Sequence, residues 1–135
     1  MDFRRLADSY LRQADYRLRV ARRALRDRQY AYTVRLSQES VELALKSLLR
    51  RVNVEYPKFH DVGEVLVINR DLFDEALGRQ IEDLAAASTE LMRLRPLTAY
   101  GDEARALPPE QIFSRSDAET ALAKATWVLQ TCKKG

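Results

Sequence analysis

The sequence has little of several residue types on which common functional sites depend. Its 135 residues include one cysteine, one histidine and four glycines. A single cysteine excludes an internal disulfide framework, and one cysteine with one histidine gives no zinc-ligand spacing. The four glycines form neither a P-loop nor a G-x-G-x-x-G turn, so no glycine-rich loop can hold a phosphate. The sequence therefore predicts no metal site and no cofactor.

Long apolar runs are also absent. No segment approaches the roughly 20 apolar residues that a membrane span needs. The first residues, MDFRRLADSYLRQ, are charged throughout and lack the apolar stretch of a secretion signal. Hydrophobic residues make up 46% of the chain and charged residues 32%, as in ordinary globular proteins. We expect one cytoplasmic domain over residues 1–135, without membrane contact.

Charge is distributed unevenly along the chain. Residues 1–51 contain 13 Lys and Arg against 6 Asp and Glu, whereas residues 52–135 contain 10 against 14. The excess is mostly arginine in the first 28 residues, and guanidinium groups match phosphate and carboxylate well. The pattern is compatible with a nucleic-acid or nucleotide partner. It is more typical of a solvated helix face that pairs with acidic helices elsewhere in the bundle or in a partner subunit.

Hydrophobic periodicity predicts an all-α, antiparallel up-and-down bundle of about five helices. The first two helices are expected over residues 2–27 and 30–52, joined by a short turn. A short third helix is expected over 61–69, although Val65–Ile68 alone could also form a strand. The fourth is expected over 72–94, ended by Pro96. A long loop over 95–115 then precedes the last helix, for which Ser116 and Glu119 form a capping box.

Residues 36–66 carry the most informative pattern. An amphipathic helix, SQESVELALKSLL, is followed by a break at Tyr56-Pro57 and then by Pro57-Lys-Phe-His60-Asp61. Asp61 suits the N-cap position for the apolar residues that follow. Farther along, Arg95-Pro-Leu-Thr-Ala-Tyr100-Gly101 places an arginine before a tyrosine and a glycine.

These segments resemble the HEPN family (higher eukaryotes and prokaryotes nucleotide-binding domain), and the resemblance extends over nearly the whole chain. It implies a small helical bundle that binds nucleotide or RNA and pairs with a separate minimal nucleotidyltransferase, as in a toxin–antitoxin-like pair. The residues that it points to as nucleotide- or phosphate-binding are Lys46, His60, Asp61, Arg95 and Tyr100.

Each main candidate also has a structural interpretation. His60 could act as a general base or contact a phosphate, or it could bind a neighbouring backbone group at a helix entry. Arg95 could contact a phosphate or the carbonyl groups at a helix end. Tyr100 could stack on a base or pack against the bundle. Trp127, beside the apolar stripe of the last helix, is interpreted as a core or interface residue.

The sequence departs from the HEPN ribonucleases, whose Arg-x(4–6)-His motifs from two subunits form a metal-independent RNA-cleaving site. His60 is the only histidine, and eight residues separate it from Arg51. Tyr100 stands where the motif after Arg95 would need histidine, and a phenol with a pKa near 10 is a poor proton shuttle. A binding module is therefore favoured over a metal-independent endoribonuclease. A helical protein-interaction module without a ligand is a further alternative.

Two expectations concern assembly and the site. Apolar residues outside the main seams (Tyr16, Val20, Leu36 and Leu49) predict a homodimer, because a bundle hides one stripe per helix in its own core. His60, Arg95 and Tyr100 are expected to face a common cleft, since the fourth helix is long enough to return Arg95 to the His60 end.

Overall fold

The computed structural model of the protein describes residues 2–56 and 61–134. This part of the chain is all-α, as predicted. Its helices are α1 (Arg4–Arg26), α2 (Tyr30–Arg51), α3 (Val62–Ile68), the 3₁₀ turn η1 (Arg70–Leu72), α4 (Glu75–Gly78), α5 (Ile81–Tyr100), α6 (Pro109–Ile112) and α7 (Arg115–Lys134). No helix in these ranges is both long and apolar enough to cross a membrane.

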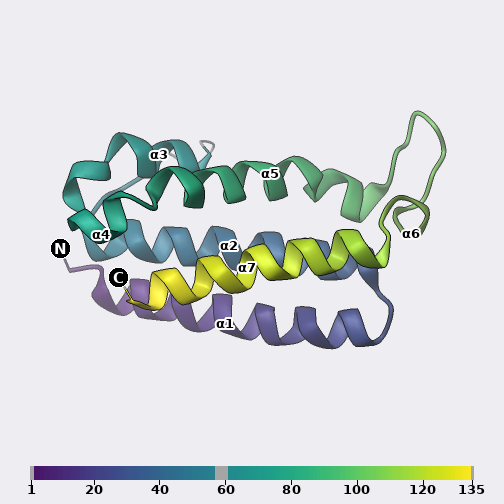
Figure 1. Cartoon of the computed structure of the whole chain (residues 1–135), viewed down its shortest axis with the longest axis horizontal. Helices are drawn as coiled ribbons and strands as arrows, with labels where there is room; N and C mark the ends of the chain where they lie inside the picture. The colour runs from purple at the N-terminus through teal and green to yellow at the C-terminus, as the bar shows by residue number, and fades with distance from the viewer. Residues whose placement is uncertain (1, 57–60, 135) are drawn as a thin grey trace.

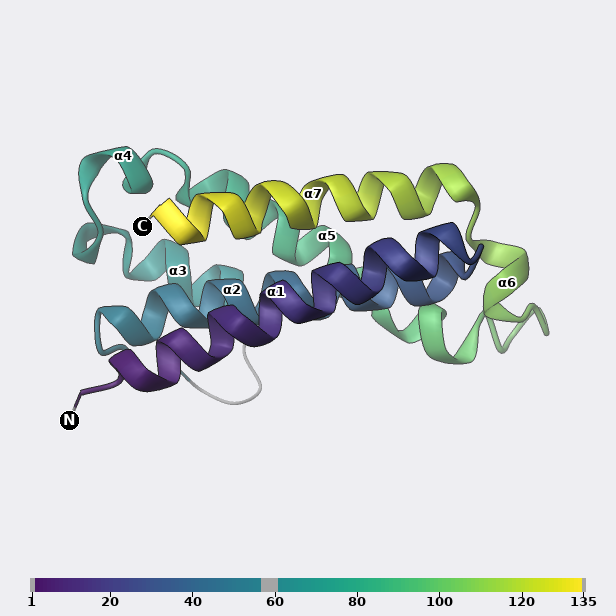
Figure 2. The ribbon, with the colours of Figure 1, turned by 90° about the horizontal axis from the view of Figure 1, so that it is seen from below.

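The four long helices α1, α2, α5 and α7 run up and down beside one another, which confirms the predicted bundle (Figure 1). Helix α2 is central, because α1, α5 and α7 all pack against it. In Figure 1, α5 lies above α2, α1 lies below it and α7 covers its near side. Figure 2 shows the same bundle with α1 in front of α2. The side of α2 that faces away from α7 is therefore not covered by a long helix.

A seam of small residues joins α1 and α2. Ala7, Ala14 and Ala21 recur every seven residues on α1, and Thr33, Ser40 and Ser47 do so on α2; all six are buried. Ser40 Oγ donates a hydrogen bond to the Ala14 carbonyl oxygen over 2.8 Å, which fixes the antiparallel register at this pair. Small side chains at a helix contact allow the two backbones to approach closely. The hairpin is therefore packed through backbone proximity rather than through large side chains.

Helix α3 confirms the predicted short helix, and the strand alternative was wrong. The Asp61 side chain accepts a hydrogen bond from the Gly63 amide at 2.9 Å, as an N-cap does. Gly63 is buried against α5: a Cβ built there would lie 3.0 Å from the Ala85 carbonyl oxygen. The absence of a side chain at Gly63 thus sets how closely α3 approaches α5.

The predicted fourth helix over 72–94 was wrong at both ends. At its start the chain passes through η1 and the four-residue α4 before α5 begins at Ile81. The local reason is capping, because the Asp74 carboxylate accepts a hydrogen bond from the Leu77 amide at 2.8 Å and starts a separate helical turn.

At its other end, α5 continues through Pro96 to Tyr100, so Arg95 and Tyr100 lie on a helix and not in a loop. Leu97 packs on the core and Thr98 is buried, which compensates for the hydrogen bond that proline removes. The helix ends at Gly101, whose φ of 68° favours glycine. Paired hydrogen bonds between Asp102 and Leu107 then close a tight turn.

The capping box predicted at Ser116 and Glu119 was also wrong by two residues. Helix α7 begins at Arg115, and Ser114 is the residue whose hydroxyl accepts from the Asp117 amide, at 3.2 Å. The Asp117 carboxylate in turn accepts from the Ser114 amide at 2.9 Å, so the reciprocal pair is Ser114 with Asp117.

Candidate functional site

The uncovered side of α2 carries a stripe of charged residues, which we call the α2 polar stripe: Arg35, Glu39, Glu42 and Lys46. Their steps of four, three and four residues place them on one helix face. Helix α1 borders this stripe on one side and α5 on the other, since each contributes an arginine to it.

At one position, Lys46 and Arg95 meet at Glu42. A terminal nitrogen of Arg95 lies 3.7 Å from one Glu42 carboxylate oxygen, and Lys46 Nζ lies 3.8 Å from the other. The same Arg95 nitrogen donates to Gln38 Oε1 over 3.0 Å. Gln38 is buried, so it gives the guanidinium a fixed anchor. The structure therefore brings together two of the predicted site residues, Lys46 and Arg95.

These side chains are partly solvated. Lys46 is 31% exposed, Glu42 32% and Arg95 44%. At such exposure each ion pair contributes at most about 1 kcal/mol to stability. The cluster holds two cations against one carboxylate, and both cations remain open to solvent. An arrangement of this kind can accept an anion without disturbing the core.

An aromatic residue extends the cluster along α2. The Tyr56 ring centroid lies 5.5 Å from Lys46 Nζ and 4.8 Å from the Arg50 guanidinium carbon. Partial burial raises the pKa of the Tyr56 hydroxyl above its usual value, so the phenol is neutral at physiological pH. Tyr56 therefore serves as a neutral platform between two cations and not as a proton donor poised near neutrality.

Asp61 has a structural position. Besides capping α3, its carboxylate accepts a hydrogen bond from Thr89 Oγ1 of α5 over 2.8 Å. These contacts use both carboxylate oxygens and fasten the start of α3 to α5. Ser88, whose hydroxyl also faces Asp61 at 3.5 Å, is two helical turns before Arg95 on the same side of α5. His60, which was predicted to share a cleft with Arg95, lies outside the described residues.

Tyr100 stands apart from Arg95. Five residues along a helix correspond to a rotation of about 140°, so the two side chains leave α5 in different directions. Tyr100 is 72% exposed at the end of the helix. The structure therefore does not place Tyr100 in the cluster around Glu42.

A second cluster on the α2 polar stripe was missed in the sequence. Arg17 of α1 donates from Nε to one Glu39 oxygen over 3.0 Å, and Arg35 donates from Nε to the other over 3.2 Å. The spacing of Arg35 and Glu39 on one helix is visible in the sequence. The contribution of Arg17 depends on the register of the α1–α2 hairpin, which the spacing of residues in the sequence does not show.

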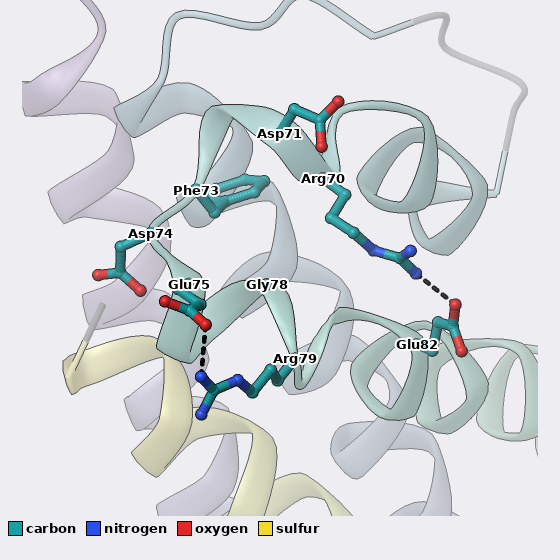
Figure 3. A pocket seen from close by; sticks show the side chains of 8 residues that line it. All are labelled: Arg70, Asp71, Phe73, Asp74, Glu75, Gly78, Arg79 and Glu82. Carbon is teal, nitrogen blue, oxygen red and sulfur yellow. Dashed lines mark hydrogen bonds and ion pairs between the residues drawn. The ribbon is translucent and has the colours of Figure 1, made fainter.

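Other chemistry-bearing groups offer less. Burial raises the pKa of the Cys132 thiol to about 12, so it is not a reactive thiolate. Among the residues that the structure describes, no group of histidine, cysteine and carboxylate side chains could hold a metal ion. A depression of about 590 Å³ near α4 is lined mostly by charged residues (Figure 3). Its two arginines pair with acidic neighbours, Arg70 with Glu82 and Arg79 with Glu75.

Comparison with known proteins identifies the family. The HEPN domain matches residues 7–135. The chain belongs to the HEPN family. A solved structure, the crystal structure of TT1696 from Thermus thermophilus, is 28% identical and aligns with a TM-score of 0.73 over 99% of this chain and 98% of that one. Curated proteins gave no significant match.

Membership in the HEPN family agrees with the observed all-α bundle and with the resemblance noted in the motifs. It places the chain among helical domains of the nucleotide-binding and ribonuclease type.

Proposed function

We propose that this HEPN domain binds a nucleotide or RNA through phosphate at the cluster formed by Glu42, Lys46 and Arg95, and that it does not cleave the ligand. The observation that carries the proposal is the convergence of two cations from different helices on one carboxylate. A phosphate oxygen offers the same charge and acceptor geometry as that carboxylate oxygen. An arriving phosphate would therefore meet side chains that are already directed toward an anion.

The position of Arg95 supports this role over helix capping. Its guanidinium reaches across to α2 and bonds Gln38 rather than the carbonyl groups at the end of α5. Its exposure leaves room for a ligand on the solvent side. A guanidinium that is anchored at one nitrogen loses less side-chain entropy when the remaining nitrogens bind a phosphate.

Absence of cleavage is proposed from the sequence. The chain has no Arg-x(4–6)-His pair, and Tyr100 follows Arg95 at the distance where histidine would be required. Tyrosine does not replace that histidine, because a phenol is a poor proton shuttle at neutral pH.

We further propose that the domain acts as the partner subunit of a minimal nucleotidyltransferase in a toxin–antitoxin-like pair, and that it is a homodimer. The exposed side chains of Tyr16 and Trp127 support an interface with a second copy of the chain. Leu36 and Leu49 do not, because they are buried within the chain's own core, contrary to the expectation from their off-seam positions. Sedimentation equilibrium at micromolar concentration should give twice 15.6 kDa, and a monomer would contradict the proposed dimer.

Equilibrium binding of a labelled nucleotide and a short RNA tests the phosphate site. Arg95→Ala should weaken binding by about 1.5–3 kcal/mol, the scale of a hydrogen bond to a charged group. Arg93→Ala is the matched control, because it removes the same charge from an exposed neighbour on α5. Binding should also weaken as salt increases, since phosphate contacts release counterions. Equal effects of the two substitutions would refute a specific role of Arg95.

The endoribonuclease alternative is tested by incubating labelled RNA with the wild type and with His60→Ala in the presence of a chelator. We expect no cleavage by either protein. Cleavage by the wild type that is lost in the variant would make the domain a metal-independent ribonuclease. If neither binding nor cleavage is found, the remaining interpretation is a protein-interaction module without a ligand.

A further inference from the structure

We infer that a second copy of this chain docks on the outer face of α7, with the two α7 helices antiparallel across a two-fold axis. The inference rests on the proposed homodimer and adds the surface and the orientation. In Figure 1, α7 lies in front of α2 and its outer side faces the viewer. Six residues that are at least partly exposed form this face: Glu119, Ala123, Thr126, Trp127, Gln130 and Lys134.

The outer face of α7 has the composition of an interface centre. Between residues 120 and 132, Lys124 is the only charged residue, and it pairs with Glu90 of α5. Over the whole chain, 32% of the residues are charged, so this stretch is depleted in charge. Trp127, which is 36% exposed, lies in the middle of it. Low charge together with an aromatic residue distinguishes interface centres from the rest of a protein surface.

The six positions are arranged symmetrically about the point midway between residues 126 and 127. Ala123 precedes this point by as many residues as Gln130 follows it. Glu119 and Lys134 are related in the same way, one turn or more farther out. At about 100° per residue, all six positions lie within an arc of about 100°. An antiparallel copy centred on this point therefore places Glu119 opposite Lys134 of the second copy, at both ends of the contact.

Glu119 is available for that contact. Within its own helix it accepts a hydrogen bond from Arg115 Nε over 2.9 Å through one carboxylate oxygen. An ionised carboxylate has about four acceptor sites on its two oxygens, so Glu119 can also accept from an ammonium group. Its side chain is 54% exposed, which leaves space for Lys134 of the second copy.

Trp127 separates two depressions on the surface of α7. One, of about 340 Å³, lies between α7 and α4 on the side of Gln130. The other, of about 410 Å³, lies between α7 and α1 on the side of Thr126, and its walls include Leu25, Leu122 and Ala123. A two-fold axis through the centre of the face carries Trp127 of one copy to the Thr126 side of the other. Each indole therefore meets the depression with apolar walls, as an aromatic anchor does at an interface centre.

This orientation determines how the anion clusters are arranged in the dimer. The α2 polar stripe lies on the side of α2 that faces away from α7, behind the bundle in Figure 1. Docking through α7 thus leaves the two stripes on opposite outer sides, and each copy keeps its own cluster around Glu42. The arrangement differs from that of the HEPN ribonucleases, in which motifs from two subunits form one site.

Sedimentation of the full chain over a concentration series measures the dissociation constant of the dimer. Trp127→Ala should raise this constant at least about thirtyfold, the scale for loss of an aromatic anchor. Tyr16→Ala is the matched control, because Tyr16 is 60% exposed on α1 and lines neither depression. It should change the constant less than about twofold. Circular dichroism should show the same helix content in both variants, and a dimer that dissociates only in Tyr16→Ala would overturn the inference.

A charge-reversal pair tests the antiparallel orientation and leaves the core untouched. Glu119→Lys and Lys134→Glu should each weaken the dimer about tenfold, because like charges then face each other at both ends. The double variant should return to within about threefold of the wild type. Glu119→Lys combined with Arg93→Glu on exposed α5 restores the net charge without the pair and should stay weak. Equal recovery in the two double variants would show that only net charge matters and would contradict the orientation.

Failure of the inference differs from failure of the proposed homodimer. If the wild type sediments as a monomer at every concentration, both are wrong. If it is a dimer that neither Trp127→Ala nor Glu119→Lys weakens, the homodimer stands and the α7 surface is wrong. A dimer that both substitutions weaken and that the paired reversal restores is the expected outcome.

Discussion

The α1–α2 hairpin and the region of residues 61–108 are built in different ways. In the hairpin, two uninterrupted helices of 23 and 22 residues are joined by a short turn and meet along a repeating seam of small side chains. Residues 61–108 include α3, η1, α4 and α5 and depend on single residues at special positions. Gly63 permits close packing of α3, and Gly101 reverses the chain after α5.

The difference shows two ways to position a site. The hairpin repeats one packing rule along its length, so Arg17, Arg35 and Glu39 are held by a regular register. In the second region, Arg95 is positioned by the packing of α5 against α2 and by its hydrogen bond to Gln38. Substitutions along the hairpin seam should therefore have similar, graded effects on the free energy of unfolding. In residues 61–108 the effect should depend strongly on which residue is replaced.

The largest expected effect is that of Gly101→Ala. A Cβ at this position would overlap the Leu107 carbonyl oxygen, and φ of 68° is unfavourable for alanine. Strain and overpacking together should lower the free energy of unfolding by roughly 2–5 kcal/mol. Ala106→Gly in the same turn, where alanine already has a positive φ, should change it by less than about 0.5 kcal/mol. Urea denaturation measures both, and a neutral Gly101→Ala would disprove the steric role of this glycine.

Ala14→Leu should have an intermediate effect. Ala14 is fully buried beside Ser40, and its carbonyl group accepts the hydrogen bond that fixes the hairpin register. A larger side chain would separate α1 from α2 and should lower the free energy of unfolding by about 1–3 kcal/mol. Ala86→Leu, on an exposed position of α5, should stay within about 0.5 kcal/mol. If both variants unfold at the same urea concentration, the seam is not closely packed.

The smallest effect is the contrast between Gly63→Ala and Gly78→Ala. Alanine stabilises a helix relative to glycine by at most about 1 kcal/mol at positions near helix ends such as these. At Gly78 the nearest atom is Arg70 Cγ at 3.9 Å, so this gain should be realised. At Gly63 contact with the Ala85 backbone at 3.0 Å should cancel it. The two variants should then differ by about 1–2 kcal/mol. Thermal unfolding of the pair measures the difference, and equal stabilisation would argue against tight contact at Gly63.

Periodicity was sufficient to predict the long helices. The apolar positions of α1, α2 and α7 recur at helical spacing, and the observed limits differ from the predicted ones by at most two residues. It failed at Pro96, because burial of Leu97 and Thr98 carries α5 beyond the proline. It also failed at Asp74, where a local cap interrupts what the apolar pattern presents as one helix. At both places local helix propensity competes with tertiary burial. The spacing of apolar residues does not show which of the two effects is stronger.

Less of the candidate site could be predicted. Lys46 and Arg95 were selected from a family resemblance, and their meeting at Glu42 depends on how α5 packs against α2. Asp61 was correctly predicted as an N-cap, because capping is local. Tyr100 was assigned to a loop and lies on a helix that directs it away from Arg95. Arg17 was absent from the candidates, because its contact with Glu39 is made across two helices.

The register fixed by Ser40 and Ala14 has a consequence for the order of folding. Contacts in the α1–α2 hairpin join segments that are close in the sequence, whereas α7 must return from the far end of the chain to reach α2. Closing a short loop costs less entropy than closing a long one, so the hairpin should form first. Conservative substitutions in its seam should then slow folding, while those at the α2–α7 contact should mainly accelerate unfolding. Helix α2, which carries the polar stripe, would thus be in place before the rest of the bundle closes around it.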